Sequence, residues 1–275
     1  MKVLNAEELR VAEGLLFKHL PKSLKVYGLL HGMKRNKVNT VDVVVDTWPD
    51  FKVIICRPDH KVSATVSVSY YSTDEQILRR MLTEENSLDW STYFMVGGFD
   101  LTHATLLKDV SSARGVNAQL RCVVHTMYLP DCSSCLNVSA KSNELQSRIS
   151  SLNDSHVELV NSTWKFGGDE VGYWNVKNYI SNFPSCCITD DQGQPVSWIL
   201  VYNYCAMGIL YTLPEHRQKG YAKIMISTLA RKLHAEGYPV YCFIEEDNEL
   251  SHRLFKKMGF TEDPSYRAAW FEFNV

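Results

Sequence analysis

The segment YTLPEHRQKGYA, residues 211–222, gathers basic side chains, a glycine and an alanine into one short turn. A strand-like apolar run precedes Pro214, and an amphipathic run with helical spacing follows Lys219. The first N–H groups of a helix have no partners inside the helix, and the helix dipole places positive charge beside them. Phosphate oxygens bind at such a position, and a glycine lets the ligand approach the backbone closely. The segment therefore predicts either a phosphate-binding turn or a solvated corner between a strand and a helix.

The elements around this turn favour the phosphate-binding alternative. Two helical patterns, at 154–167 and 170–184, come before it, and three strand-like runs between 185 and 213 predict an antiparallel meander. After the turn we expect three more elements, followed by a last strand. These are a helix over 219–236, a strand over 239–246, a helix over 248–260 and a strand over 266–275. The turn thus joins the third strand of a meander to a long helix.

The first half of the chain has a similar order of elements, which predicts an α/β (α+β) fold throughout. We expect helices at 6–20, 74–86 and 102–113, and strands near 23–30, 41–47, 51–57, 64–71, 91–98 and 119–129. A polar stretch then separates the halves, which gives a first domain over 1–135, a linker over 136–150 and a second domain over 151–275. The halves are either diverged duplicates or independent folds of the same kind.

Composition limits the partners of the protein. A net charge of −2 over 275 residues gives no global attraction to nucleic acid, so any anion site must be local. No apolar run approaches the roughly 20 residues that span a bilayer. Eight cysteines without a recognisable secretory signal indicate reduced thiols, so secretion is not expected. The CxxC pair of Cys132 and Cys135 lacks the second pair of ligands that a zinc site needs, so no metal is expected. The oligomeric state is not readable.

Several motifs resemble those of a known family. YTLPEHRQKGYAKIMISTLARKL (211–233) resembles the acetyl-CoA-binding motif of the GNAT superfamily of N-acyltransferases, and NELSHRLFKKMGF (248–260) resembles the segment that follows it. Shorter stretches, among them WKFGGDE (164–170) and FPSCC (183–187), are similar to the glycine N-acyltransferase family and especially to its glycine N-acyltransferase-like members. The resemblance implies tandem GNAT-like domains, each a mixed, mostly antiparallel twisted sheet flanked by helices. It also implies a degenerate first half and a catalytic second half.

The resemblance implies acyl-CoA as co-substrate, with its pyrophosphate on backbone N–H groups from Gln218 to Ala222. The pantetheine would pair with the edge of the strand that ends at Thr212. Asn248 matches a superfamily position near the cofactor, although an ordinary helix N-cap explains it equally well. The implied cofactor-binding residues are Leu210, Thr212, Arg217, Gln218, Lys219, Gly220, Tyr221, Ala222 and Asn248.

The catalytic residues depart from the family pattern. The amine acceptor must lose a proton before it attacks the thioester, yet the family's glutamate base aligns with Ala206. The superfamily's general-acid tyrosine aligns with Phe255, which cannot donate a proton. Glu245 is the next candidate for the base and Glu246 its alternative, unless both are merely solvated residues at a strand end. Arg267 and Lys165 are candidates for binding the carboxylate of an amino-acid acceptor.

The resemblance therefore implies acyl transfer to glycine or a similar small amine. Because no Cys or Ser stands in a recognisable nucleophile motif, we expect direct attack in a ternary complex without a covalent acyl-enzyme. Two alternatives remain open: the same chemistry on a different amine acceptor, either another amino acid or a protein amine, and a CoA-binding protein with weak or no turnover. The expected partners are small molecules, namely acyl-CoA and the amine. Family habit suggests mitochondria, with the cytosol as the alternative.

Overall fold

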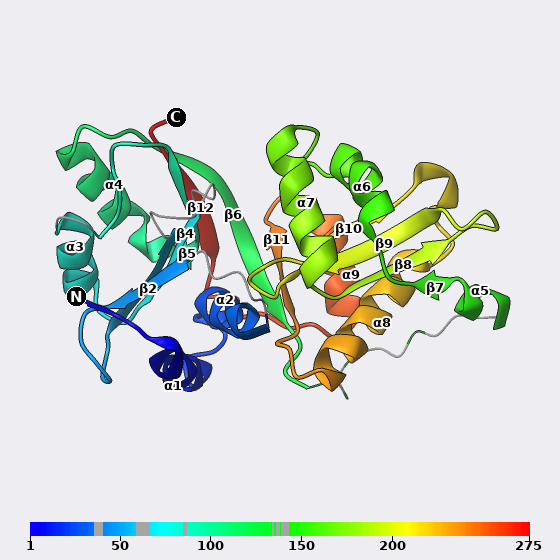
Figure 1. Cartoon of the computed structure of the whole chain (residues 1–275), viewed down its shortest axis with the longest axis horizontal. Coiled ribbons are helices and arrows are strands. Elements are labelled where there is room, and N and C mark those ends of the chain that lie inside the picture. Colours follow the sequence, from blue (N-terminus) through cyan, green and yellow to red (C-terminus); the bar gives the residue numbers. More distant parts are fainter. Residues whose placement is uncertain are drawn as a thin grey trace. The chain divides into compact units, whose positions relative to one another are not determined.

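The computed structural model describes residues 1–35, 41–58, 67–84, 87–131, 133, 135, 138 and 143–275. Packing divides the chain into two compact units (Figure 1). Unit 1 comprises Met1–Thr126, Glu245–Asp247 and Glu262–Val275, and unit 2 comprises Met127–Ile244 and Asn248–Thr261. The last strand therefore packs in unit 1, whereas the linear division at 136–150 assigns it to the second domain. Cys132 lies outside the described residues.

Unit 1 holds four helices, one 3-10 turn and seven strands within its described residues. In chain order they are β1 (Lys2–Val3), α1 (Ala6–Phe17), α2 (Leu24–Arg35), β2 (Val41–Val45), β3 (Val53–Pro58), β4 (Ser67–Ser72), α3 (Glu75–Thr83), β5 (Phe94–Asp100), η1 (Leu101–His103), α4 (Ala104–Ala113), β6 (Ala118–Tyr128) and β12 (Ala268–Phe273). The strand order is β1-β2-β3-β4-β5-β12-β6. Strands β2, β3 and β4 form an antiparallel meander, and β5 runs parallel to β4.

The C-terminal strand β12 lies between β5 and β6 and pairs antiparallel with both. Its side chains alternate between the two faces of the sheet, so Phe271 and Phe273 both enter the core beneath α3 and α4. The Phe273 ring stacks on Phe94 at 4.7 Å, and the Phe271 ring meets Phe99 edge to face at 5.1 Å. The last residues of the chain thus complete the core of the first unit.

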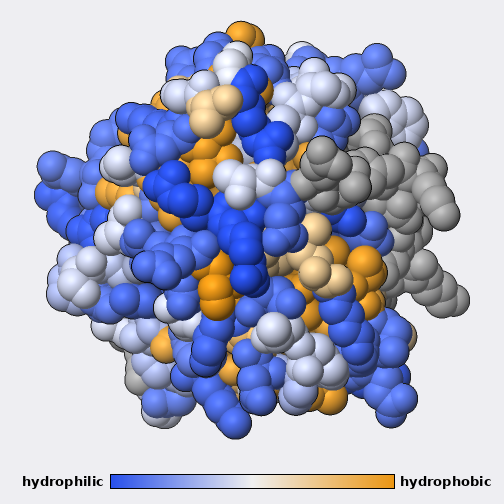
Figure 2. All heavy atoms as spheres, turned by 90° about the vertical axis from the view of Figure 1, so that its left-hand side faces the viewer, coloured by the Kyte–Doolittle hydropathy of each residue, from blue (hydrophilic) through white to orange (hydrophobic). Residues whose placement is uncertain are grey.

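The surface of unit 1 in Figure 2 is largely hydrophilic. Hydrophobic residues reach it in patches that hydrophilic side chains separate, as is usual for a globular surface.

One expected element of unit 1 is wrong. Residues 23–30 form most of helix α2, not a strand. Leu24, Val26, Leu29 and Leu30 are buried, and this short apolar run fits both a strand and a helix that is largely buried. The periodicity of so few residues does not separate the two, and packing against α1 and β4 decides it.

Unit 2 repeats the order of elements of unit 1. Its elements are α5 (Asn143–Ser147), β7 (Ile149–Ser150), η3 (Asp154–His156), α6 (Val157–Thr163), α7 (Glu170–Asn182), β8 (Ser185–Thr189), β9 (Pro195–Val201), β10 (Met207–Thr212), η4 (Pro214–His216), α8 (Tyr221–Ala235), β11 (Tyr241–Glu245) and α9 (Glu249–Lys257). Glu245, at the end of β11, packs with unit 1. Each unit has two helices, an antiparallel meander, a helix, a strand parallel to the third meander strand, and another helix. This shared order favours the duplication hypothesis.

The expected meander of unit 2 is confirmed, because β8 pairs antiparallel with β9 and β9 with β10. Helices α6 and α7 cover one face, where they bury Trp198, Leu200 and Ile209. Helix α8 packs on β8, β9 and β10 (Figure 1). Strand β11 runs parallel to β10, and their register holds one residue pair, Met207 and Cys242. The two strands therefore separate soon after β10 begins.

Among the described helices, none has the length and apolar content needed to cross a membrane.

Because β12 packs in unit 1, truncating a core side chain of β12 should destabilise unit 1. We expect Phe271→Ala to destabilise unit 1 by about 3–5 kcal/mol, because Phe271 is 1% exposed. Hydrogen exchange should show amide protection falling in β2–β5. Phe166→Ala, at a phenylalanine that is 47% exposed, is the control and should leave protection unchanged. Loss of protection confined to β8–β11 after Phe271→Ala would contradict this placement.

Candidate active site

Unit 2 contains an open cleft of about 430 Å³ where β10 ends and α8 and α9 begin. The lining residues come from the end of β10, the turn after it, the first turn of α8 and the first turns of α9. They are Thr212, His216, Arg217, Gln218, Gly220, Tyr221, Ala222, Lys223, Leu250, Ser251 and Leu254.

The turn before α8 has an unusual backbone. Gln218 and Gly220 both have positive φ, of 62° and 82°. Only glycine adopts such angles without steric cost, so Gly220 suits its position and Gln218 is held there by its neighbours. Within the described residues, the backbone N–H groups from Gln218 to Lys223 have no hydrogen-bond acceptor. Five of these six residues line the cleft.

Helix α8 differs from other helices of the chain in how it begins. Helices α1, α3, α7 and α9 each begin with an Asn or Asp side chain that accepts a hydrogen bond from the first turn. Gly220 stands at this position of α8 and has no side chain to offer, and the first turn of α8 contains no acidic residue. The positive end of the helix dipole thus remains open to an external anion.

Basic side chains surround the open N–H groups. The Arg217 Nε donates a hydrogen bond of 3.0 Å to the Thr212 carbonyl, and the guanidinium lies 5.6 Å from the ring centre of Tyr211. Lys219 Nζ lies 3.5 Å from Nδ1 of His216. Arg217 and Lys219 are exposed, so they add positive charge to the rim of the cleft while remaining solvated.

Strand β10 is irregular where it leaves β11. Its register with β9 shifts between Gly208 and Tyr211, and the intervening Ile209 has φ of 50°. A positive φ is costly for a β-branched residue, and such strain often marks a functional site. The bulge interrupts the regular pairing of β10 with β9 just after the one residue pair that joins β10 to β11.

The corresponding turn of unit 1 is closed. Asp74, between β4 and α3, accepts a 3.0 Å hydrogen bond from the Ile77 N–H, so its carboxylate occupies the position of an anion. Tyr70 lies on β4 after the two residues that pair with β5. Its Oη lies 3.3 Å from Nδ1 of His103, and the two buried rings stack. In unit 1 a side chain therefore caps the helix start that unit 2 leaves uncapped.

The structure brings six of the nine predicted cofactor residues together around the cleft, namely Thr212, Arg217, Gln218, Gly220, Tyr221 and Ala222. Lys219 lies in the same turn and Leu210 on β10, but neither lines the cleft. The Asn248 side chain accepts a 3.1 Å hydrogen bond from the Ser251 N–H, so it caps α9.

Five lining residues were not among the predicted ones: His216, Lys223, Leu250, Ser251 and Leu254. His216 and Lys223 lie within the motif, and their basic side chains were reason enough to predict them as part of the anion site. Leu250, which is 77% exposed at the start of α9, has no charge that could have indicated it from the sequence. Only the tertiary packing shows that the first turns of α9 face the turn before α8.

The two positions predicted to align with the family's proton carriers are buried and apolar. Ala206 is fully buried in the turn between β9 and β10, where its carbonyl accepts a 2.9 Å hydrogen bond from the Tyr202 N–H. Phe255 is 5% exposed and packs edge to face on Phe260 at 5.0 Å. Glu245 is half-buried and belongs to unit 1, whereas every residue lining the cleft belongs to unit 2.

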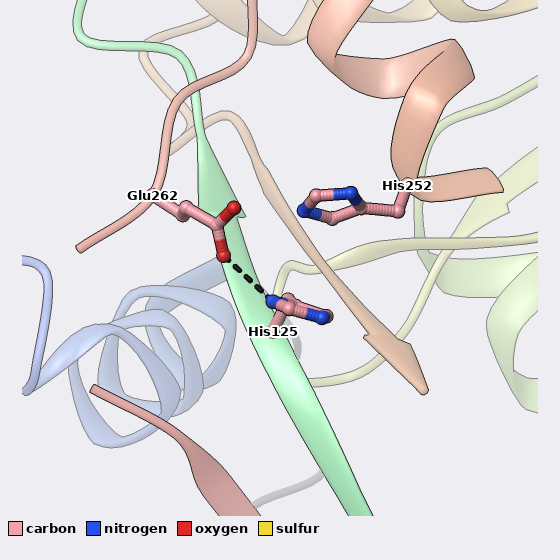
Figure 3. Close-up of side chains that lie close together, drawn as sticks. All are labelled: His125, His252 and Glu262. Carbon is pink, nitrogen blue, oxygen red and sulfur yellow. Dashed lines mark hydrogen bonds and ion pairs between the residues drawn. The ribbon is translucent and has the colours of Figure 1, made fainter. Parts of the chain in front are cut away.

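The charged residues that accompany Glu245 in unit 1 form ion pairs. Arg267 Nε lies 2.8 Å from Glu246 Oε1, and Arg267 Nη1 lies 3.8 Å from Glu262 Oε2. His125 Nδ1 lies 2.7 Å from the same oxygen of Glu262, as Figure 3 shows. Within unit 1, Arg267 therefore joins the segment after Glu245 to the segment that precedes β12.

Comparison with known sequences identifies the family. The sequence model of the aralkyl acyl-CoA:amino acid N-acyltransferases matches residues 1–184, and the model of their C-terminal region matches residues 186–274. The chain belongs to the aralkyl acyl-CoA:amino acid N-acyltransferase family. Within this family it is 28% identical to the glycine N-acyltransferase of Mus musculus over 271 residues. It is 26% identical to the glycine N-phenylacetyltransferase of Bos taurus over 265 residues, and each match covers 90% of both chains.

Solved structures confirm the fold class of this family member. A Drosophila protein of known crystal structure matches with a TM-score of 0.81 at 17% identity, covering 98% of this chain and 97% of that one. A tandem GNAT protein from the clavulanic acid biosynthesis pathway matches with a TM-score of 0.53 at 13% identity, covering 98% and 96%. The expected enzyme class is also confirmed: this member of the family, with its GNAT fold, is an acyl-CoA N-acyltransferase.

The cap formed by Asn248 can be separated from a contact with the cofactor. We expect Asn248→Ala to lower the free energy of unfolding by about 1 kcal/mol, because it removes the cap of α9. Asn248→Ser should retain stability, since Ser also caps helices. Urea unfolding and CoA titration of both variants check this. A stable Asn248→Ser variant with weakened CoA binding would show that the side chain also contacts the cofactor.

Proposed function

We propose that the enzyme transfers the acyl group of an acyl-CoA to the amino group of glycine, by direct attack of the amine within a ternary complex. The observation that carries this proposal is the open row of N–H groups from Gln218 to Lys223 at the start of an uncapped helix. The names of the relatives support glycine as the acceptor.

The pyrophosphate of CoA is assigned to the N–H groups at the start of α8, with Arg217, Lys219 and Lys223 adding positive charge. The pantetheine is assigned to the edge of β10, from Thr212 towards Leu210, where β11 no longer pairs with it. Leu250 and Leu254 of α9 would cover apolar parts of the cofactor. Only one CoA site per chain is expected, because Asp74 closes the corresponding turn of unit 1.

Direct attack is supported by the state of the cysteines in unit 2. A covalent acyl-enzyme needs a reactive thiolate or an activated hydroxyl. Burial raises the pKa of Cys186 to about 12 and also raises the pKa values of Cys187 and Cys242. These thiols stay protonated at neutral pH and are poor nucleophiles.

The glycine ammonium must lose its proton before attack, and we assign this role to Glu245. The oxyanion would accept a backbone N–H from the bulged part of β10. With Ala206 and Phe255 buried and apolar, proton transfer is the weakest step of this mechanism. This same observation favours the second candidate, a CoA-binding protein with little turnover. A mitochondrial location is inferred from the family resemblance, with the cytosol as the alternative.

A thiol-release assay tests the proposal. The purified chain is given benzoyl-, phenylacetyl- and oleoyl-CoA against a panel of amino acids, while free CoA thiol is measured. Release with glycine supports the proposal, and release with another acceptor alone would replace glycine by that acceptor. CoA binding without release from any pair would leave the binding-protein candidate.

The anion site can be tested with two matched glycines. Gly220 and Gly193 have φ of 82° and 80°, and a Cβ at either would meet no atom within 4 Å. We expect Ala at either position to cost about 1 kcal/mol of stability through backbone strain. Gly220→Ala alone should weaken CoA binding, by about tenfold or more, because distorting the turn costs charge-assisted hydrogen bonds to phosphate. Calorimetric titration measures affinity and stoichiometry. Equal CoA affinities in the two variants would place the anion site elsewhere.

A carboxylate at position 206, where the family's base is predicted to align, tests whether proton removal limits the rate. We expect Ala206→Glu to raise kcat/KM with glycine at neutral pH by about tenfold or more, since a general base typically contributes this much. Ala206→Gln is the control for size, because it adds similar volume without a proton acceptor. Both variants will lose stability, since Ala206 is fully buried, so folding is checked by circular dichroism. A folded Ala206→Glu enzyme with an unchanged rate would show that proton removal is not limiting.

A further inference from the structure

The ring of Tyr202 covers Gly208, the one residue of β10 without a side chain. A Cβ atom added at Gly208 would overlap Cε2 of Tyr202 and would lie 2.8 Å from its Cζ. The ring therefore lies directly against the backbone of the strand. Gly208 pairs in register with Leu200, so the ring is on the face of the sheet that α6 and α7 cover.

Aromatic neighbours hold the Tyr202 ring in this place. It stacks on Tyr204 at 5.0 Å with an interplanar angle of 13°, meets Tyr179 of α7 edge to face at 5.2 Å, and lies 6.3 Å from Trp164 at the end of α6. Such pairs add stability beyond the burial of their area. Because the contacts come from three elements, the ring cannot leave Gly208 without disturbing all of them.

The ring stands beside the path of the cofactor along β10. Gly208 immediately precedes the bulge at Ile209 and follows Met207, which is the only residue of β10 in register with β11. A pantetheine that follows the strand from Thr212 towards the bulge brings its thioester to this end of β10. Tyr204 lies 6.2 Å from Phe243 of β11, which extends the aromatic row to the neighbouring strand. Tyr202, Tyr204 and Phe243 are each only half-buried.

We propose that Tyr202, seated on Gly208, determines the specificity of this enzyme for the acyl group. An acyl chain that continues past the bulge meets the ring at Gly208, so the site takes compact acyl groups and excludes extended alkyl chains. The inference rests on the proposed function, because the direction in which the cofactor runs along β10 comes from that proposal.

Calorimetric titration with CoA, benzoyl-CoA and octanoyl-CoA tests the proposal on the full-length chain. In the wild type, octanoyl-CoA should bind no more tightly than CoA, because its chain finds no room. In Tyr202→Ala, the affinity for octanoyl-CoA relative to CoA should rise about tenfold, which corresponds to two newly buried methylene groups. Tyr202→Phe keeps the ring and should behave as the wild type.

Tyr173→Ala is the matched control, since Tyr173 is a half-buried tyrosine of α7 whose ring packs on Trp174. It should leave the ratio of the two affinities unchanged. Tyr202→Leu keeps an apolar side chain on Gly208 and replaces Tyr202→Ala if the latter does not fold. An unchanged ratio in folded Tyr202→Ala, or in Tyr202→Leu where it replaces the former, overturns this inference alone if the variant still binds CoA. Failure of the wild type to bind CoA overturns the proposed function and this inference with it.

Discussion

Helix α8 begins without a capping side chain, and the organisation of the candidate site depends on this. Six consecutive N–H groups, from Gln218 to Lys223, have no acceptor among the described residues. Leaving so many donors open is tolerable only where solvent or an anion reaches them. The exposed turn, the positive φ of Gly220 and the separation of β10 from β11 all keep them accessible. The elements of unit 2 around the turn thus fix the position of these N–H groups.

The two units share the same order of elements, but the turn that precedes the helix after the meander is capped by a side chain in unit 1 and uncapped in unit 2. In unit 1 the carboxylate of Asp74 satisfies the start of α3, and the rings of Tyr70 and His103 join the ends of the two parallel strands. In unit 2 Gly220 and the bulge at Ile209 stand at the corresponding places. Unit 1 in turn takes β12, the last strand of the chain, into its core. The first unit thus uses the residues that follow the second unit to complete its sheet.

Cofactor binding and proton transfer are separable in this enzyme. The anion site needs only backbone N–H groups and positive charge, and both lie in one continuous segment. Proton transfer needs a titratable side chain at the reacting amine, and the two positions predicted to align with the family's proton carriers hold a buried alanine and a buried phenylalanine. Binding of the cofactor can therefore be measured apart from turnover.

The sequence alone determined the local features. The glycine in the turn, the meander before it and the helix after it follow from residue types and spacing over short stretches, and the site around Gly220 could be predicted from them. Residues 23–30 show the limit, since a short apolar run fits a helix and a strand equally well and only packing chose the helix. The tertiary structure alone brought Leu250 and Ser251 to the cleft, placed Phe271 in unit 1 and seated Tyr202 on Gly208. These are contacts between residues distant in the chain or around a bulge, and no periodicity encodes them, because they depend on how whole elements pack.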